Sequence, residues 1–460
     1  MNNFFSVQTL QQAQPDMTKK VTTILSLPRD AYKIFTKAFF LASIIFFSTC
    51  NSTKPQKRDK EREQTKTYSK DANDLQVDMF LYHADSLNSQ LYYNINNTQL
   101  VYKKTDSTTN FSARVKVFYK FLPYADAKIF FDSSTVYIND KVQGEPHAKM
   151  LVGYISLKIP TAQTSYIELY ITDVNGKKHQ THFIKNEKQD PFGQQSYILI
   201  GDGGRIFFSN KIEKGNTINV YNTRVTYNKA RIDFFANDYS LPPPPFSDRA
   251  PLPYPSIPDS TFFISSYDGH NIQFQIARQG VYFIRLDSSA NVNGCTVMGV
   301  EKNFPKVLSH AQMIAATRFI LNKEEYQKII NAKDKEAAIN NFWLTLGGGE
   351  DRAKELIKRY YNRVQDANTF FTSHVEGWKT DMGMIYIVFG PPNKTYKTQQ
   401  METWTYGTDG APNSATFRFE KINNPFSENN FKLIRNANYR DPWTIAVSNW
   451  REGHVYLEPK

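Results

Sequence analysis

The chain has 460 residues, 14% of them aromatic, and a formal net charge of +12. This length exceeds one ordinary domain and predicts about three. Large flat side chains favour pleated, half-buried surfaces, so their abundance predicts a β-rich body and excludes disorder for most of the chain. Because the basic residues are mostly scattered, the charge favours a solvated basic surface and no nucleic-acid partner.

The N-terminal segment has the pattern of a secretory signal. Basic residues precede a ten-residue apolar run at 38–47, and two small residues then lead into Cys50. The run is too short to span a bilayer comfortably. Residues 1–49 are therefore predicted to be a signal peptide, with Met17 as a plausible true start. A plain signal peptide without lipid and an uncleaved anchor are the alternatives.

A cysteine directly after such a run resembles the lipobox of bacterial lipoproteins, although Phe47 and Thr49 depart from the usual pattern. In that family the cysteine becomes the first residue and carries acyl chains such as palmitate. The resemblance implies lipid attachment at Cys50 and the bacterial outer membrane as the location. Residues 50–72 contain almost no apolar side chains and are predicted to form a flexible tether. Their first charges are basic, which favours the periplasmic face over the cell surface.

The other cysteine, Cys295, lies in a strand-like setting. It has no partner for an internal disulfide if Cys50 is lipidated. A buried, inert thiol is predicted there.

Residues 73–190 are predicted to form the first of two tandem immunoglobulin-like β-sandwich domains. Short alternating segments recur, and Asn175 with Gly176 forms a two-residue hairpin signal between two of them. The predicted strands lie at 114–119, 157–159, 166–171 and 177–183.

Residues 191–303 are predicted to form the second sandwich. Its predicted strands lie at 197–200, 205–208, 217–221, 272–276 and 280–287, and the glycine-rich segment 201–204 is a hairpin turn. Eight prolines between 242 and 258 impose extended geometry that cannot join a central strand. They predict a rigid loop packed across its own domain, and the alternative is a recognition site for a partner's aromatic groove.

Residues 304–460 change to helical periodicity and then return to strands. Asp334 is a cap for a helix that glycines 347–349 end. The next helix has an apolar stripe from Ala353 to Ala367 at spacings of three and four, and its other faces are basic. Strands are predicted at 384–389, 404–406 and 417–419. Together these segments predict an α+β domain in which helices precede a three-stranded meander.

The most distinctive segment of the chain surrounds the predicted strand 384–389. Its residues resemble the signature of the GWxTD domain, a family found in large bacterial envelope proteins, and the resemblance covers 304–460. The matching residues are Gly377, Trp378, Thr380, Asp381, Gly383, Tyr386, Gly390, Pro391 and Pro392.

Turn chemistry accounts for the polar residues of this motif. Thr380 and Asp381 can bind the backbone of the turn, and Trp378 can cover the core edge with its N–H paired. The motif is therefore predicted to be a folding device with no catalytic residue. The alternative makes Glu376 and Asp381 a carboxylate pair beside Trp378, as in sugar chemistry. His374, in the same turn, is expected at the surface.

The sequence lacks a nucleophile elbow, a phosphate-binding loop and a zinc-binding helix motif. His179 and His182 are three apart on a predicted strand and point to opposite faces, so no metal and no cofactor are predicted.

The resemblance and these absences predict a non-enzymatic outer-membrane lipoprotein. It would act as a scaffold or accessory subunit, with other envelope proteins, in a complex for outer-membrane protein assembly, secretion or surface export. The alternative is an envelope hydrolase or glycan-binding module that uses Glu376, Trp378 and Asp381. A third hypothesis is direct peptidoglycan or lipopolysaccharide contact through the basic helix at 352–363.

Overall fold

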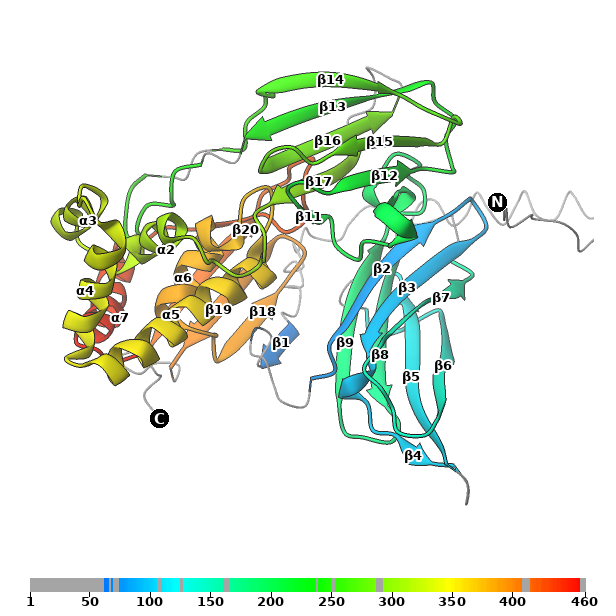
Figure 1. Ribbon diagram of the computed structural model, residues 1–460, viewed down its shortest axis with the longest axis horizontal. Helices are drawn as coiled ribbons and strands as arrows, with labels where there is room; N and C mark the ends of the chain where they lie inside the picture. The colour runs from blue at the N-terminus through cyan, green and yellow to red at the C-terminus, as the bar shows by residue number, and fades with distance from the viewer. Residues whose placement is uncertain are drawn as a thin grey trace, which may run out of the picture. The chain divides into compact units, whose positions relative to one another are not determined.

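The computed structural model describes residues 62–65, 68, 74–105, 109–124, 127–159, 165–236, 239–249, 253–286, 293–407 and 414–455. The predicted signal peptide and Cys50 lie outside these residues. Within them, no helix combines the length and the apolar character needed to cross a bilayer. Figure 1 shows two units built of β-strands and one region that combines helices with a sheet. Each of the three contains a large hydrophobic cluster of buried side chains.

The first β unit is a sandwich of two antiparallel sheets around one core. Apolar side chains from both sheets, such as Leu91 and Val117, are fully buried in it, which confirms the predicted sandwich. One sheet contains β2 (Val77–His83), β3 (Ser89–Asn96) and β7 (Met150–Leu157). The other contains β4 (Lys103–Lys104), β5 (Asn110–Leu122), β6 (Asp132–Gln143), β8 (Ser165–Asp173) and β9 (His179–Asn186). The hairpin predicted at Asn175 and Gly176 joins β8 to β9.

The second β unit repeats the plan of a small and a large sheet. The small sheet contains β10 (Ile198–Ile200), β12 (Thr217–Tyr221) and β15 (Asn271–Gln275). The large sheet contains β11 (Lys211–Glu213), β13 (Lys229–Ala236), β14 (Ser260–Ser265), β16 (Gly280–Leu286) and β17 (Cys295–Val300), with β11 and β17 parallel. The strand predicted at 205–208 is reduced to one bridge, between Ile206 and Ile200. Cys295 is fully buried in this core, and burial raises the pKa of its thiol to about 12.

The α+β region combines helices with one antiparallel sheet. The helices are α2 (His310–Ala316), α3 (Lys323–Ile330), α4 (Lys335–Gly347), α5 (Glu350–Phe371), α6 (Asp381–Phe389) and α7 (Arg440–Arg451). The sheet runs in the order β1 (Arg62–Thr65), β18 (Lys394–Lys397), β19 (Met401–Tyr406), β20 (Ala415–Lys421) and β21 (Phe431–Leu433). Both predicted helices are confirmed: Asp334 accepts from Ala337 N at 2.9 Å to cap α4, and Gly348 ends α4 in the left-handed conformation.

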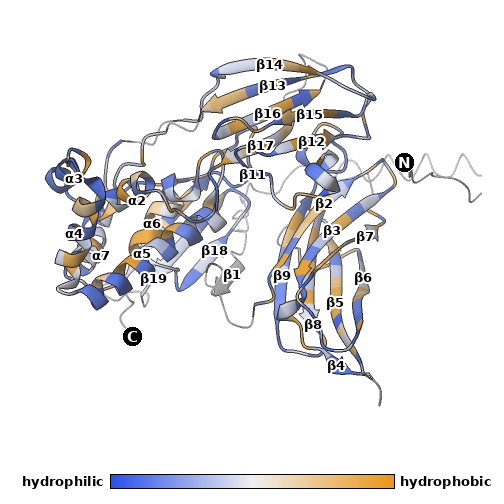
Figure 2. Ribbon diagram, in the orientation of Figure 1, coloured by the Kyte–Doolittle hydropathy of each residue, from blue (hydrophilic) through white to orange (hydrophobic). Residues whose placement is uncertain are grey.

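The prediction of a strand at 384–389 is wrong, because this segment belongs to helix α6. Thr380 is its N-cap, and Gly390 follows its end with φ of +89°. All nine residues of α6 are buried, so the helix is apolar around most of its surface (Figure 2). A fully buried helix loses the three-to-four periodicity of an amphipathic one, and its short apolar run then looks like a buried strand.

The prediction of a flexible tether at 50–72 is wrong for the residues of this range that the structure describes. Residues Arg62–Thr65 form β1, which pairs antiparallel with β18 at the edge of the C-terminal sheet. The meander predicted with three strands therefore has four, β18 to β21, and gains a fifth from the N-terminal side of both β units. Residues 74–300 are thus an insertion between two parts of one sheet.

The described part of the proline-rich loop packs across the C-terminal region rather than only its own domain. Pro243 O accepts from Arg435 Nη2 at 2.9 Å, and Pro245 O accepts from Asn436 N at 3.2 Å. The ring of Tyr254 lies 5.8 Å from that of Phe426.

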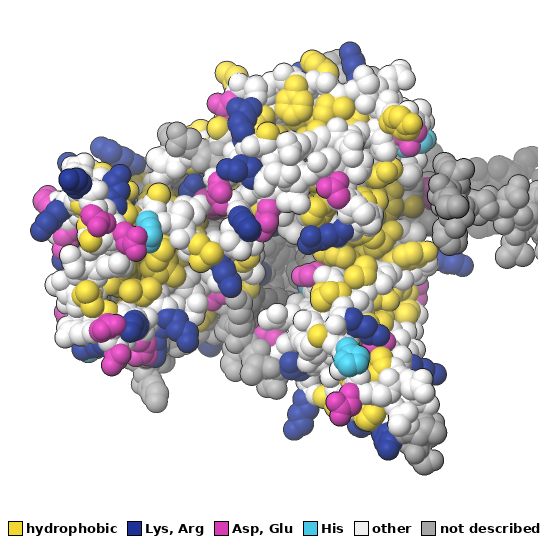
Figure 3. Space-filling model, viewed as in Figure 1, with side chains coloured by type: hydrophobic (Ala, Val, Ile, Leu, Met, Phe, Trp, Pro, Cys, Tyr) yellow, Lys and Arg dark blue, Asp and Glu magenta, His cyan; other side chains and the backbone are white. Residues whose placement is uncertain are grey.

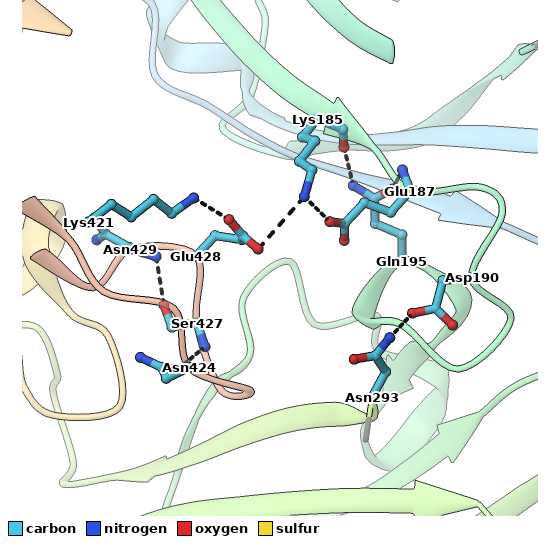
Figure 4. Close-up of polar contacts among 10 residues, drawn as sticks. All are labelled: Lys185, Glu187, Asp190, Gln195, Asn293, Lys421, Asn424, Ser427, Glu428 and Asn429. Atoms are coloured by element: carbon cyan, nitrogen blue, oxygen red, sulfur yellow. Dashed lines mark hydrogen bonds and ion pairs between the residues drawn. The ribbon is translucent and has the colours of Figure 1, made fainter. Parts of the chain in front are cut away.

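The loop between β20 and β21 reaches both β units. Phe426 inserts between Phe235 and Phe283 of the second unit, with ring centroids at 4.8 and 5.4 Å. Beside it, Glu428 Oε1 lies 3.8 Å from Lys185 Nζ of the first unit, whose ammonium also binds Glu187 (Figure 4). Figure 4 also shows the neighbouring bond in which Asn293 Nδ2 donates to Asp190 Oδ2 at 2.8 Å and joins the two β units.

Candidate functional site

Two glycines of the motif allow three backbone segments to approach one another. A Cβ on Gly377 would lie 1.9 Å from Ala367 O in α5, and a Cβ on Gly383 would lie 1.9 Å from Gly377 O. Gly377 N donates to Thr372 Oγ1 at 2.9 Å, which fixes the short 3₁₀ turn Gly377–Lys379 against the end of α5. No larger residue fits at either position without moving the backbone.

Trp378 and Thr380 link this turn to α6. Thr380 Oγ1 accepts from Gly383 N at 3.0 Å, and its hydroxyl donates to Gly377 O at 2.7 Å. The side chain of Trp378 is 2% exposed in the core, and its backbone N donates to Asn368 Oδ1 at 3.2 Å. The expectation of a paired indole N–H is wrong, because Trp378 Nε1 has no hydrogen-bond partner among the described residues.

Asp381 forms a buried, two-pronged ion pair with Arg435. Arg435 Nη2 donates to Asp381 Oδ1 at 2.6 Å and Arg435 Nη1 donates to Oδ2 at 3.1 Å. Leu433 N adds a third bond to Oδ2 at 2.9 Å. The same guanidinium also donates to Pro243 O, so the motif aspartate holds the arginine that binds the proline-rich loop.

Glu376 faces different groups. Its Oε1 accepts from Gln279 Nε2 at 3.1 Å and from Gln312 Nε2 at 3.4 Å, while Oε2 lies 2.8 Å from Lys379 Nζ. Gln279 lies just before β16, so Glu376 connects the motif to the second β unit. Each carboxylate therefore has its own set of partners, and Trp378 presents no open ring face to solvent.

The C-terminal end of α6 is closed by buried side chains from other elements. Arg363 of α5 donates to Ile387 O at 3.1 Å and to Val388 O at 3.0 Å, and Trp450 Nε1 donates to Val388 O at 2.9 Å. Burial lowers the pKa of Arg363 to about 10. Tyr406 donates to Gly390 O at 2.9 Å. After Gly390, Pro391 is exposed and Pro392 is buried.

Tyr386, the motif tyrosine, leads to a residue that the sequence did not indicate. Its hydroxyl donates to Tyr68 O at 2.9 Å, and the Tyr68 hydroxyl donates to Glu402 Oε1 at 2.7 Å. Lys397 Nζ donates to the Tyr68 hydroxyl at 2.8 Å. Tyr68 lies in a polar segment with no apolar periodicity, so only the structure could reveal this contact.

Histidine 374 is buried, which corrects its expected surface position. Its ring lies 5.3 Å from Tyr239 and 6.4 Å from Phe426. Burial lowers the pKa of His374 to about 4. In the described parts of the chain, no group of three or more His, Cys, Asp and Glu side chains could hold a metal ion.

The outer face of the first sandwich presents apolar side chains to solvent. Phe80, Tyr92 and Tyr154 are cross-strand neighbours on β2, β3 and β7, and the Phe80 and Tyr92 rings stack at 4.9 Å. Val152 and Tyr154 are each 53% exposed. Hydrophobic side chains gather over these three strands (Figure 3), beside a cleft of about 890 Å³.

Comparison with known proteins identifies the C-terminal region. The model of the GWxTD domain matches residues 280–452, so the matched segment begins at β16 and includes the whole motif. No curated protein matches this chain. Among solved structures, the crystal structure of red sea bream transglutaminase is similar over 49% of this chain and 31% of that chain, with 11% identity and a TM-score of 0.17. A score this low gives no information about fold or activity. The chain therefore carries a GWxTD domain, which spans residues 280–452.

Proposed function

We propose that the protein is a non-enzymatic scaffold or accessory subunit of a bacterial envelope complex, anchored by lipid at Cys50 to the periplasmic face of the outer membrane. The complex would serve outer-membrane protein assembly, secretion or surface export. One observation carries the scaffold role: the motif residue Asp381 and the glutamate that precedes the motif, Glu376, join separate parts of the chain. Asp381 holds the proline-rich loop through Arg435, and Glu376 binds Gln279 of the second β unit.

Separating the partners of a buried ion pair leaves an uncompensated buried charge, so such a pair opposes relative movement of the segments that it joins. Joined segments suit a scaffold better than a flexible enzyme lid. The alternative, a hydrolase or glycan-binding module, requires a substrate to reach Glu376, Trp378 and Asp381. These side chains belong to residues that are 2%, 2% and 4% exposed. Glycan binding that is lost in Trp378→Ala, with the fold intact by circular dichroism, would favour the alternative.

Membrane fractionation tests the anchor. The wild-type chain and the control Cys295→Ala are expected in the membrane pellet, and Cys50→Ala in the soluble fraction. Retention of Cys50→Ala in the membrane with full function would contradict lipid anchoring.

Purification from detergent-solubilised membranes tests the scaffold role. A stable complex with other envelope proteins is expected, with the same proteins recovered at different detergent concentrations. A monomer that carries no other protein would contradict the role.

A further inference from the structure

The GWxTD domain contains an aromatic seat that is filled by one side chain from the far N-terminal part of the chain. Tyr68 lies 318 residues before Tyr386, which binds its backbone carbonyl. The Tyr68 ring packs on three others, with centroid distances of 5.5 Å to Phe370, 4.9 Å to Phe371 and 5.3 Å to Trp404. We call these three rings, together with Tyr386, Lys397 and Glu402, the tyrosine seat.

The polar groups of the seat are specific for a tyrosine. The Tyr68 hydroxyl donates to Glu402 Oε1 and accepts from Lys397 Nζ, and this ammonium lies 4.6 Å from the ring centroid. Phenylalanine would lose both hydroxyl bonds, one of which reaches a buried carboxylate. Burial and the charge of Glu402 hold the pKa of Tyr68 well above its usual value, so the hydroxyl remains a donor.

The backbone next to Tyr68 is recognised as a strand. Arg62 to Thr65 pair antiparallel with Lys397 to Lys394 of β18. This is strand addition to a sheet edge, in which main-chain bonds give affinity and a side-chain pocket gives specificity.

The seat keeps its internal partners when Tyr68 is removed. Glu402 also accepts from Trp404 Nε1 at 2.7 Å and lies 3.4 Å from Lys397 Nζ, so the buried carboxylate stays bonded. Without β1, the sheet edge becomes β18, whose Lys394 and Lys397 are the charged residues that protect natural edge strands. When Tyr68 is absent, the buried carboxylate of the seat therefore remains paired and the exposed sheet edge carries charged side chains. Both features allow the domain to exist with an empty seat.

We propose that the GWxTD domain is a receptor for an extended, tyrosine-bearing peptide segment, and that the strand Arg62–Thr65 and the side chain of Tyr68 of the same chain are its ligand. The proposal is independent of the lipid anchor. It gives the motif residue Tyr386 a role in binding this segment.

A labelled peptide of residues 60–70 tests the receptor in the full-length chain. The variant Gln64→Pro/Tyr68→Ala places a proline within β1 and removes the ring, and should leave the seat open. The peptide is expected to bind this variant saturably and the wild-type chain at least about tenfold more weakly, because the wild-type segment competes at a high effective concentration. A Tyr68→Phe peptide should bind the variant at least about tenfold more weakly than the original. Equal binding of both peptides, or no binding, would overturn the proposal.

Hydrogen exchange in full-length Tyr68→Phe separates a bound segment from an integral core element, and it does not depend on the double variant. Amides of Arg62–Thr65 should exchange at least about tenfold faster, while those of β19 and β20 keep their wild-type rates. An equal increase in β19 and β20 would show that Tyr68 is simply part of the core and would overturn the proposal.

Discussion

At the scale of single residues, the motif is defined by close approach rather than by exposed chemistry. Gly377 and Gly383 each occupy a place where a Cβ would lie 1.9 Å from a backbone oxygen. Both oxygens belong to main chain that is fixed by α5 or by the motif turn, so neither can yield as a flexible side chain could. The small size of the two glycines is therefore required for the turn and α6 to pack together.

Gly383→Ala should lower the free energy of unfolding by about 3 kcal/mol or more, because overpacking must shift the backbone. Denaturant unfolding followed by circular dichroism measures the loss. Gly349→Ala is the matched control, since no atom lies within 4 Å of its Cβ position and its φ is 175°. A Gly383→Ala chain as stable as this control would contradict the packing argument.

Two buried histidines should make the fold sensitive to mild acid. Burial lowers the pKa of both His374 and His83 to about 4. The unfolded chain, with an ordinary histidine pKa of about 6.5, takes up protons first as pH falls. Their contribution to stability is complete above pH 6.5 and is lost between pH 6.5 and 4, by up to about 3 kcal/mol each.

Unfolding free energies measured from pH 8 to pH 4 test this expectation. His374→Phe, which keeps an aromatic ring beside Tyr239 and Phe426, should flatten the acid limb. The exposed His147→Ala is the control variant. An acid limb with the wild-type slope in His374→Phe would contradict the assignment.

At the scale of elements, the sequence predicts structure where end signals and periodicity agree. Helices α4 and α5 were predictable because Asp334 caps one and buried residues recur at spacings of three and four in the other. The sequence predicts a strand where α6 lies because the apolar run of this helix has no polar face. Its end signals were present in the sequence: Thr380 at the start, and Gly390 with Pro391 after the end.

Thr380→Ala should destabilise the domain by about 1 to 2 kcal/mol, because α6 loses its N-cap and the turn loses its bond to Gly377 O. Thr380→Ser keeps the hydroxyl and should restore most of the difference. Thermal unfolding of the two variants gives the comparison. A serine variant as unstable as the alanine variant would assign the effect to the lost methyl group instead.

At the scale of the whole molecule, the site depends on pairs that are distant in sequence. Asp381 was predicted in a turn, but Arg435 is 54 residues away and Tyr68 precedes Tyr386 by 318 residues. Local patterns cannot identify such partners, because each is a single polar or aromatic residue without periodic neighbours. The β-sandwich class could be predicted because the alternation of apolar and polar residues along a strand is a local property. The contacts that join the β units to each other and to the C-terminal region could not be predicted from it.

Phe426→Ala should weaken one of these joints without unfolding the parts that it connects. The ring packs on Phe235 and Phe283, and its removal leaves a cavity between the β20–β21 loop and the large sheet of the second β unit. Limited proteolysis should cut the 422–430 loop faster than in the wild type, while the circular dichroism spectrum is preserved. The control is Phe263→Ala, which removes a ring that is 60% exposed on β14. Equal cleavage rates for both variants would contradict a joint at Phe426.

The pairing of β1 with β18 has a consequence for synthesis. The two partners in the contact between Tyr68 and Lys397 are 329 residues apart, so the N-terminal strand leaves the ribosome long before its sheet exists. At about 5 to 20 residues per second, it waits on the order of 15 to 65 seconds for β18. Both β units are synthesised during this interval, so the C-terminal sheet cannot be completed until after both of them have been made.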